Sequence, residues 1–219
     1  MTEPSVRPLV AVLDYGIGNL HSAQKALEKM GADARLTTDP GLVADALGVV
    51  LPGVGAFGAC MSALRSVGLE AAALDAVESG RPFLGICVGM QMLFDGSDED
   101  PAASGLGVLE GTVRWIPPGV KRPQMQWNRL DLRLIDDPML RHLGDDPWVY
   151  FVHSLHGVPD DPGTVAATCE YGVTIHAAFR RDNVFATQFH PEKSGPTGLQ
   201  LLANFVGVCT DSRDRVGTA

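Results

Sequence analysis

Residues 83–91 read Phe83-Leu84-Gly85-Ile86-Cys87-Val88-Gly89-Met90-Gln91, and this stretch predicts the fold of the chain. Its first residues are apolar, as in a buried strand, and Pro82 precedes them at a position where a strand tolerates proline. Two glycines flank Cys87, and a helix is predicted to follow. A strand that turns directly into a helix is the repeating unit of a parallel sheet covered by helices. We therefore expect an α/β protein in which Cys87 ends a central strand.

The residues before this stretch repeat the same alternation of strands and helices. Apolar residues from Leu20 to Met30 have the spacing of an amphipathic helix that stops at Gly31, and residues 59–77 predict one or two helices broken near Gly68. Further strands are predicted at Leu9–Leu13, Ala34–Thr37 and Val49–Leu51. The first half of the chain therefore predicts a mostly parallel central sheet with helices on both faces.

The second half, from about residue 107, has more tryptophan, proline and charge, and its alternating runs predict antiparallel strands. We expect a hairpin turn at Arg180–Asn183, a final helix over Leu199–Val208 and a smaller antiparallel sheet in this half. The strands are predicted at Trp148–Val152, Val165–Thr168, Thr174–Phe179 and Val184–Phe189. Residues 1–219 then form a single domain, with polar, frayed ends at residues 1–7 and 211–219.

Composition narrows the class of protein. The chain has 219 residues, 45% of them hydrophobic, which is enough to bury one sizeable core. A formal net charge of −9, with 17 Lys and Arg spread along the chain, argues against nucleic-acid binding, because phosphate neutralisation needs a basic stripe. No stretch approaches the roughly 18 apolar residues of a membrane helix. The start does not resemble a secretory signal, so we expect a cytoplasmic protein without membrane contact.

The four cysteines lie far apart at Cys60, Cys87, Cys169 and Cys209, with no C-x-x-C pair. This spacing disfavours a structural zinc site and a disulfide framework. We expect no metal site and no cofactor, and at least one cysteine with a chemical role.

Cys87 is the candidate nucleophile. The G-x-C-x-G pattern parallels the G-x-S-x-G turn of hydrolases, in which glycines leave room for a strained residue between strand and helix. A thiol at a helix N-terminus is favoured as the thiolate, and the N–H of Val88 points to where an oxyanion would form. The alternative is a small buried cysteine in an apolar strand, which the two flanking glycines disfavour.

A candidate base follows the last predicted strand, in Gln188-Phe189-His190-Pro191-Glu192-Lys193-Ser194. His190 and Glu192 are two residues apart, so in an extended chain, held extended by Pro191, both project to one side. A carboxylate there can hold the imidazole and stabilise its charged form. A surface His and Glu at a strand end is the alternative. The remaining histidines, His153 among them, lack a comparable partner.

The glycine-rich loop Leu51–Gly58 follows a predicted parallel strand, so it lies at the same sheet edge as Cys87. Its glycines could let a backbone N–H turn toward a reacting carbonyl. A phosphate cradle is the alternative, but the chain has no G-x-x-x-x-G-K-[ST] pattern. The loop Asp14–Asn19 is weak as a nucleotide motif, since the third glycine of the dinucleotide fingerprint is missing.

With G-I-C-V-G-M-Q, P-G-V-G-A-F and F-H-P-E-K-S in this order, the chain resembles class I (triad) glutamine amidotransferases over nearly its whole length. D-Y-G-I-G-N, Y-F-V-H-S and the Lys193-Ser194 pair make it most similar to the glutaminase subunits of imidazole glycerol phosphate synthase. The resemblance implies hydrolysis of glutamine to glutamate and ammonia. It also implies a heterodimer with a (β/α)8-barrel cyclase that makes imidazole glycerol phosphate and AICAR in histidine biosynthesis.

The resemblance also implies roles for single residues. Two positions depart from the family, which usually has glycine at Gln126 and often an aromatic residue at Leu155. The implied catalytic residues are Cys87, His190 and Glu192. The implied oxyanion donors are the N–H of Val88 and, after a peptide rearrangement at Gly53, that of Val54. Substrate-binding roles fall to Gln91, Glu99 and Ser154, and partner contacts to Asn19, Trp127 and Lys193.

Two other functions are compatible with the fold. A glutaminase could serve a different acceptor synthase, which Lys193-Ser194 and the P-G-V-G-A-F loop count against. A non-catalytic regulatory relative could retain the fold without the chemistry, and it would be favoured if Cys87, His190 or Glu192 were missing. All three are present.

Overall fold

The structure is a computed structural model that describes residues 7–216. Its largest element is a sheet of eight strands in the order β2-β1-β3-β4-β13-β12-β11-β8. The five strands from β2 to β13 run parallel, and the last three are added antiparallel. Their bounds are β1 Leu9–Leu13, β2 Asp33–Thr37, β3 Gly48–Gly53, β4 Phe83–Cys87, β8 Asp131–Leu132, β11 Val165–Glu170, β12 Thr174–Arg181 and β13 Val184–Thr187. The predicted α/β class with a mostly parallel central sheet is confirmed.

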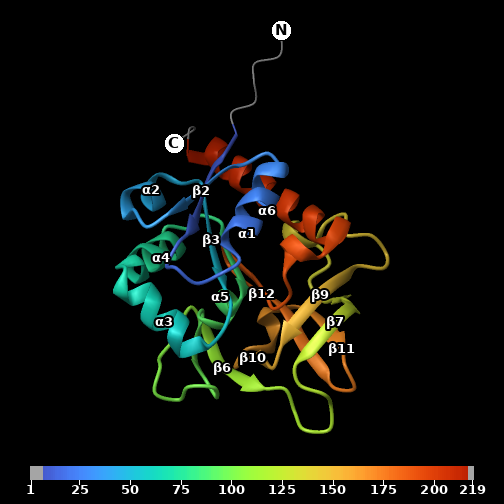
Figure 1. Cartoon of the computed structure of the whole chain (residues 1–219). Coiled ribbons are helices and arrows are strands. Elements are labelled where there is room, and N and C mark those ends of the chain that lie inside the picture. The colour runs from blue at the N-terminus through green and yellow to red at the C-terminus, as the bar shows by residue number, and fades with distance from the viewer. Residues whose placement is uncertain (1–6, 217–219) are drawn as a thin grey trace.

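The helices cover the sheet as predicted. In Figure 1, α1 and α6 lie together on one side of the molecule, while α2, α3 and α4 gather on the other. Their bounds are α1 Leu20–Lys29, α2 Pro40–Asp45, α3 Phe57–Ser66, α4 Leu69–Glu78, α5 Val88–Gln91 and α6 Gly195–Val216, with 3-10 helices at Pro138–Leu140, Pro162–Thr164 and Pro191–Lys193. The predicted break at Gly68 separates α3 from α4, because Gly68 adopts a left-handed conformation. The short helix α2 was not predicted from the sequence.

Two smaller sheets complete the second half. One joins β10 (Leu155–Pro159), β6 (Leu109–Trp115) and β5 (Phe94–Ser97), and the other pairs β7 (Gln124–Arg129) with β9 (Trp148–His153). Of the strands predicted in this half, only that at Trp148–Val152 lies in a small sheet. The strands predicted from residue 165 onward extend the central sheet. The turn predicted at Arg180–Asn183 is shorter in the structure, because β12 continues through Arg181 and only Asp182 and Asn183 join it to β13.

The C-terminal helix is longer than predicted. Helix α6 continues through residues 211–216, which we expected to be frayed. The predicted frayed residues 1–6 and 217–219 lie outside the described residues. Within residues 7–216, no helix combines the length and apolar character needed to cross a membrane.

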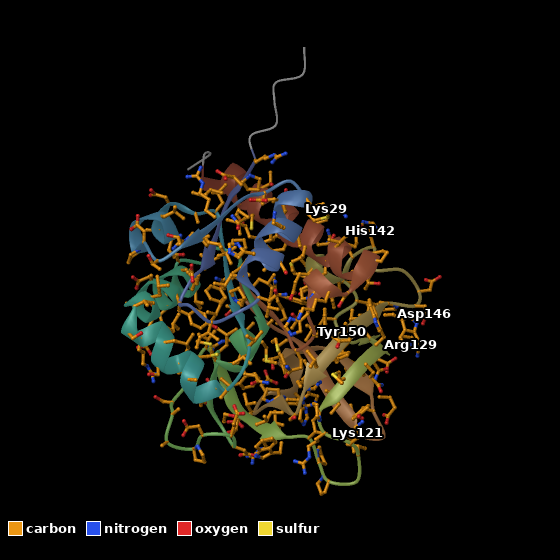
Figure 2. The ribbon with its side chains drawn as sticks, in the orientation of Figure 1. Lys29, Lys121, Arg129, His142, Asp146 and Tyr150 are labelled. Atoms are coloured by element: carbon orange, nitrogen blue, oxygen red, sulfur yellow. The ribbon has the colours of Figure 1, made fainter. Side chains whose placement is uncertain are left out.

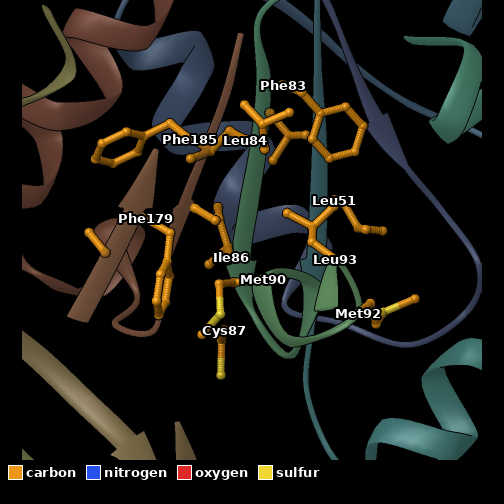
Figure 3. Close-up of a cluster of buried hydrophobic side chains, with 14 of the residues drawn as sticks. Leu51, Phe83, Leu84, Ile86, Cys87, Met90, Met92, Leu93, Phe179 and Phe185 are labelled. Carbon is orange, nitrogen blue, oxygen red and sulfur yellow. The ribbon is translucent and has the colours of Figure 1, made fainter. Parts of the chain in front are cut away.

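The core surrounds β3 and β4, whose residues are all buried because helices cover both faces of the sheet. Figure 3 shows Leu51, Phe83 and Leu84 packed along these strands, with Cys87 at the end of β4. Since β1, β3, β4 and β13 run parallel, their carboxyl ends meet at one edge. That edge carries Asn19, Gly53, Cys87 and His190.

Candidate active site

Cys87 occupies a strained turn between β4 and α5. Its backbone has φ 57° and ψ −113°, an unfavourable combination for a residue with a side chain. The flanking glycines explain why the turn can close: a Cβ on Gly89 would overlap the carbonyl oxygen of Leu51, and one on Gly85 would lie 3.0 Å from the Cα of Met90. Strain of this kind is retained where the surrounding structure holds a functional residue in place.

His190 and Glu192 form the pair that their spacing predicts. Nδ1 of His190 lies 2.8 Å from Oε1 of Glu192, and both side chains are only 2% exposed. The predicted geometry of the pair was wrong, because Pro191–Lys193 forms a 3-10 helix instead of an extended chain. The turn places the carboxylate under the imidazole, with the N–H of Lys193 donating to the His190 carbonyl.

Burial and partners set the charges of this pair. Burial alone would lower the pKa of His190, but the neighbouring Cys87 and the hydrogen-bonded Glu192 outweigh it and raise the pKa to about 9. Burial would raise the pKa of Glu192, but its bonds to His190 and Asn19 lower it. The pair is therefore held as imidazolium and carboxylate at neutral pH.

Asn19 contacts the same carboxylate. Its amide nitrogen donates to Oε1 of Glu192 over 3.1 Å, so this one oxygen accepts two hydrogen bonds. The other oxygen, Oε2, is buried with no partner in the described part of the chain. Sequence reasoning assigned Asn19 to a partner surface and missed this contact, which joins segments 173 residues apart.

A cavity of about 310 Å³ opens beside Cys87. It brings together most of the predicted site residues, namely Cys87, Val88, Val54, Gln91, Glu99, Ser154, His190 and Lys193. Glu192 and Asn19 lie behind His190, and Gly53 lies beside Cys87 in the sheet. Trp127 does not line the cavity.

Two of the three predicted substrate-binding side chains, those of Glu99 and Gln91, are already oriented by hydrogen bonds. Oε2 of Glu99 accepts from the N–H of Phe57 over 2.7 Å, at the start of α3. The Gln91 amide donates to Oε1 of Gln188 over 3.2 Å and, more weakly, to the carbonyl of Leu155. Gln188 is fully buried, and its amide nitrogen lies 3.9 Å from Sγ of Cys87. The sequence reading missed Gln188, although its place two residues before His190 was a usable signal.

His153 is a second residue that the sequence reading missed. It lines the cavity. Its Nδ1 lies 2.7 Å from the carbonyl oxygen of Leu155, and its Nε2 lies 2.9 Å from Oε1 of Gln124. Burial lowers its pKa to about 4, so the ring is neutral at neutral pH. His153 and Gln124 therefore hold the strand end that carries Ser154.

The outer face of β7 and β9 carries apolar side chains in contact with solvent. Trp127 is 47% exposed and packs against Tyr150, which Figure 2 labels on β9. Met125 and Trp148 lie on the same face and are also exposed. Gln126, the departure from the family's glycine, is exposed on the same strand, and Leu155, the other departure, is buried at the cavity.

A larger cavity lies elsewhere in the described part of the chain. It measures about 630 Å³ and opens at the amino-terminal ends of β4 and β13, opposite Cys87. Two of its polar side chains are committed to backbone carbonyls, Arg181 to that of Val108 and Asn183 to those of Val77 and Arg81. Of these two cavities, the smaller is the candidate active site, since it contains a strained cysteine beside His190.

Known proteins resemble the chain over most of its length. The family model for class-I glutamine amidotransferases matches residues 11–208. The imidazole glycerol phosphate synthase subunit HisH of Synechococcus elongatus is 50% identical over 202 residues, which cover 91% of this chain and 93% of that protein. Subunit HisH of Thermosynechococcus vestitus is 48% identical, covering 93% and 99%. The solved structure of PurLQS from Thermotoga maritima has a TM-score of 0.75 at 22% identity, covering 92% and 99%, a likeness of fold alone.

Proposed function

The chain belongs to the class-I glutamine amidotransferase family, and on that premise we propose that it is the glutaminase subunit of an imidazole glycerol phosphate synthase. The identity to subunits HisH supports the assignment to this synthase. The observation that carries the chemistry is the strained Cys87 beside the buried His190–Glu192 pair, at one cavity. A regulatory relative would have no need to keep this strain.

The reaction follows from these groups. Sγ of Cys87 attacks the side-chain carboxamide carbon of glutamine, and His190 gives a proton to the departing nitrogen, which leaves as ammonia. The glutamyl thioester that remains is hydrolysed by water, which His190 deprotonates, and glutamate and the free thiol are released. Glu192 orients the imidazole and stabilises its charge. The oxyanion is held by the N–H of Val88 and, after rotation of the peptide at Gly53, by that of Val54.

The substrate's amino-acid end would be held by the polar rim of the cavity. Glu99 uses one carboxylate oxygen for the N–H of Phe57, which leaves the other for an ammonium group. Gln91 and Ser154 provide further hydrogen-bonding groups around the same space. Leu155 supplies apolar surface where the family often has an aromatic ring.

The relatives' names support a partner subunit that uses the ammonia, and we propose a cyclase with a (β/α)8 barrel acting in histidine biosynthesis. Two features support a docking surface near the cavity: the exposed apolar face of β7 and β9, and Lys193 at the cavity rim. Asn19, Trp127 and Lys193 are the proposed contacts in the heterodimer. A nucleophilic thiol has to stay reduced, which supports a cytoplasmic location.

Ammonia release from glutamine tests this function. We expect slow hydrolysis by the isolated protein and faster hydrolysis in complex with the cyclase and imidazole glycerol phosphate, because one oxyanion donor is worth roughly 10²–10³ in kcat. A free subunit as active as the ligand-bound complex would refute the rearrangement at Gly53. Absence of glutamine hydrolysis by both the isolated protein and the complex would refute the assignment as a glutaminase. Stimulation of hydrolysis by a different acceptor synthase, and not by the cyclase, would reassign the partner.

A further inference from the structure

We propose that Tyr15 and Cys60 are positioning residues for the oxyanion loop, residues 52–55, and that they confine its rearrangement to the peptide between Gly53 and Val54. The proposal rests on the proposed function. It concerns two buried side chains to which the mechanism above gives no role. Neither of them lines the cavity, so they act through the loop and not on the substrate.

Tyr15 holds the peptide before Gly53. It follows β1, is only 3% exposed, and its hydroxyl donates to the carbonyl of Pro52 over 2.5 Å. Burial raises the pKa of Tyr15, so the hydroxyl keeps its proton and remains a donor. The carbonyl of Pro52 belongs to the peptide plane that joins Pro52 to Gly53, and this bond fixes the orientation of that plane.

Cys60 holds the peptide after Val54. It lies on the inner side of α3, is fully buried, and its thiol donates to the carbonyl of Val54 over 3.2 Å. Burial also raises the pKa of this thiol, which keeps it protonated. The carbonyl of Val54 belongs to the plane that joins Val54 to Gly55. The bond between Glu99 and the N–H of Phe57 anchors the start of α3 nearby.

The peptide between these two planes, which joins Gly53 to Val54, is not held by a side chain of residues 7–216 in this way. Within residues 7–216, no side chain forms a hydrogen bond to the Gly53 carbonyl or the Val54 N–H. A single peptide plane can rotate while its neighbours stay in place if ψ of the preceding residue and φ of the following residue change in opposite senses. Gly53 suits this because it has no side chain, and a Cβ there would come within 2.9 Å of the Tyr15 hydroxyl and 2.6 Å of the Gly89 nitrogen.

The peptide between Gly53 and Val54 lies beside the proposed nucleophile. Gly53 pairs in register with Cys87, so the rotating N–H sits at the level of the nucleophile. With both neighbouring planes fixed, rotation delivers the N–H to one position. Without the bonds from Tyr15 and Cys60, the Val54 N–H would occupy many positions after rotation, and it would stabilise the oxyanion less often.

The test compares Tyr15→Phe, Cys60→Ala and Cys60→Ser in the complex with the cyclase and imidazole glycerol phosphate. We expect kcat for glutamine hydrolysis to fall roughly tenfold or more in Tyr15→Phe and Cys60→Ala, part of the 10²–10³ of a whole oxyanion donor. KM should change less than about twofold, because substrate contacts are untouched. Cys60→Ser keeps a donor and should retain most of the activity. Matched controls are Tyr171→Phe and Cys209→Ala. The Tyr171 hydroxyl donates to the Lys121 carbonyl, and within the described residues neither of these two side chains forms a hydrogen bond to residues 52–55.

A second measurement separates positioning from damage to the catalytic residues. Alkylation of Cys87 by iodoacetamide needs the thiolate but no oxyanion hole, so its rate should match that of the original protein in all variants. Unchanged kcat in both Tyr15→Phe and Cys60→Ala would overturn the proposal, and so would alkylation that slows in parallel with kcat. If Cys60→Ala fails to fold, Tyr15→Phe, which keeps the ring, decides. Failure of the original protein to hydrolyse glutamine would refute the proposed function instead.

Discussion

Gly53 and Cys87 are register partners at the last position of two adjacent parallel strands, β3 and β4. The proposed nucleophile and the loop proposed to supply an oxyanion donor therefore leave the sheet side by side. The two segments are separate in the chain, and the pairing of β3 with β4 is what brings Gly53 and Cys87 together. This relationship makes the site a property of the sheet edge, and it underlies the predictions that follow.

Replacing Cys87 with alanine should separate the two activities of the complex. We expect glutamine hydrolysis to be abolished, while the complex still makes imidazole glycerol phosphate from added ammonium salt, because only the source of ammonia is lost. Product formation from each nitrogen source measures this. Loss of both activities would contradict a separate synthase site in the partner.

His190 and Glu192 should differ in their contributions. Removing His190 should lower kcat by about 10²–10⁴, the usual contribution of general acid–base catalysis. Glu192→Gln should cost less, because the amide can still position the ring, but it should lower the pKa of His190 from about 9 by removing the negative charge. The pH dependence of Cys87 alkylation reports this shift. An unchanged profile would remove Glu192 from the triad.

Asn19 should matter to the free subunit as well as to the complex. Asn19→Ala removes a hydrogen bond to a buried carboxylate, a contact typically worth about 1.5–3 kcal/mol. We expect slower hydrolysis by the isolated protein, because Glu192 is then held less firmly. Gln24→Ala is a suitable control, since Gln24 lies on α1, just after Asn19, and its amide donates to the Ala34 carbonyl on β2. Normal activity of the free Asn19 variant, combined with weaker cyclase binding, would assign it to the interface alone.

Lys193→Ala should weaken binding or coupling to the cyclase and leave the chemistry at Cys87 intact. The residue reaches the rim of the cavity, where its ammonium can meet an acidic partner surface. Titration of the cyclase and stimulation by imidazole glycerol phosphate measure the effect, and Lys121→Ala provides a control with the same loss of charge. Unchanged affinity together with unchanged stimulation would contradict this role.

The buried histidines should make the fold sensitive to acid. Burial lowers the pKa of both His153 and His156 to about 4, below the ordinary 6.5. Between pH 6.5 and 4 the unfolded chain binds protons that the folded chain does not, so stability falls as pH falls through this window. His190 has the opposite shift, and its contribution is lost as pH rises from 6.5 to 9. The two effects therefore occupy separate pH ranges.

Urea unfolding at pH 7 and pH 4.5 measures the acid effect. His156→Gln should lose less stability between these pH values than the original protein, since each pKa unit corresponds to about 1.4 kcal/mol. His21→Gln, an exposed position, should behave like the original protein. Equal losses in His156→Gln and the original protein would refute the assignment.

Local features of the site were predictable from sequence because they depend on neighbouring residues. The glycines beside Cys87 predict a turn too tight for side chains. The two-residue spacing of His190 and Glu192 predicts a carboxylate within reach of an imidazole. Apolar periodicity likewise predicted helices α1, α3 and α4 and strands β1 to β4 of the first half, although not helix α2. In each case the decisive atoms lie a few residues apart in the chain.

Only the tertiary structure decided which distant segments meet. Alternation along a strand reports which side chains share a face, not which strand lies beside it, so the assignment of β11, β12 and β13 to the central sheet required the pairing itself. The same holds for Asn19 against Glu192, Gln188 against Cys87 and Tyr15 against Pro52, contacts between residues 37 to 173 positions apart. Packing a parallel sheet brings the ends of its strands to one edge, and no local pattern encodes which side chains become neighbours there.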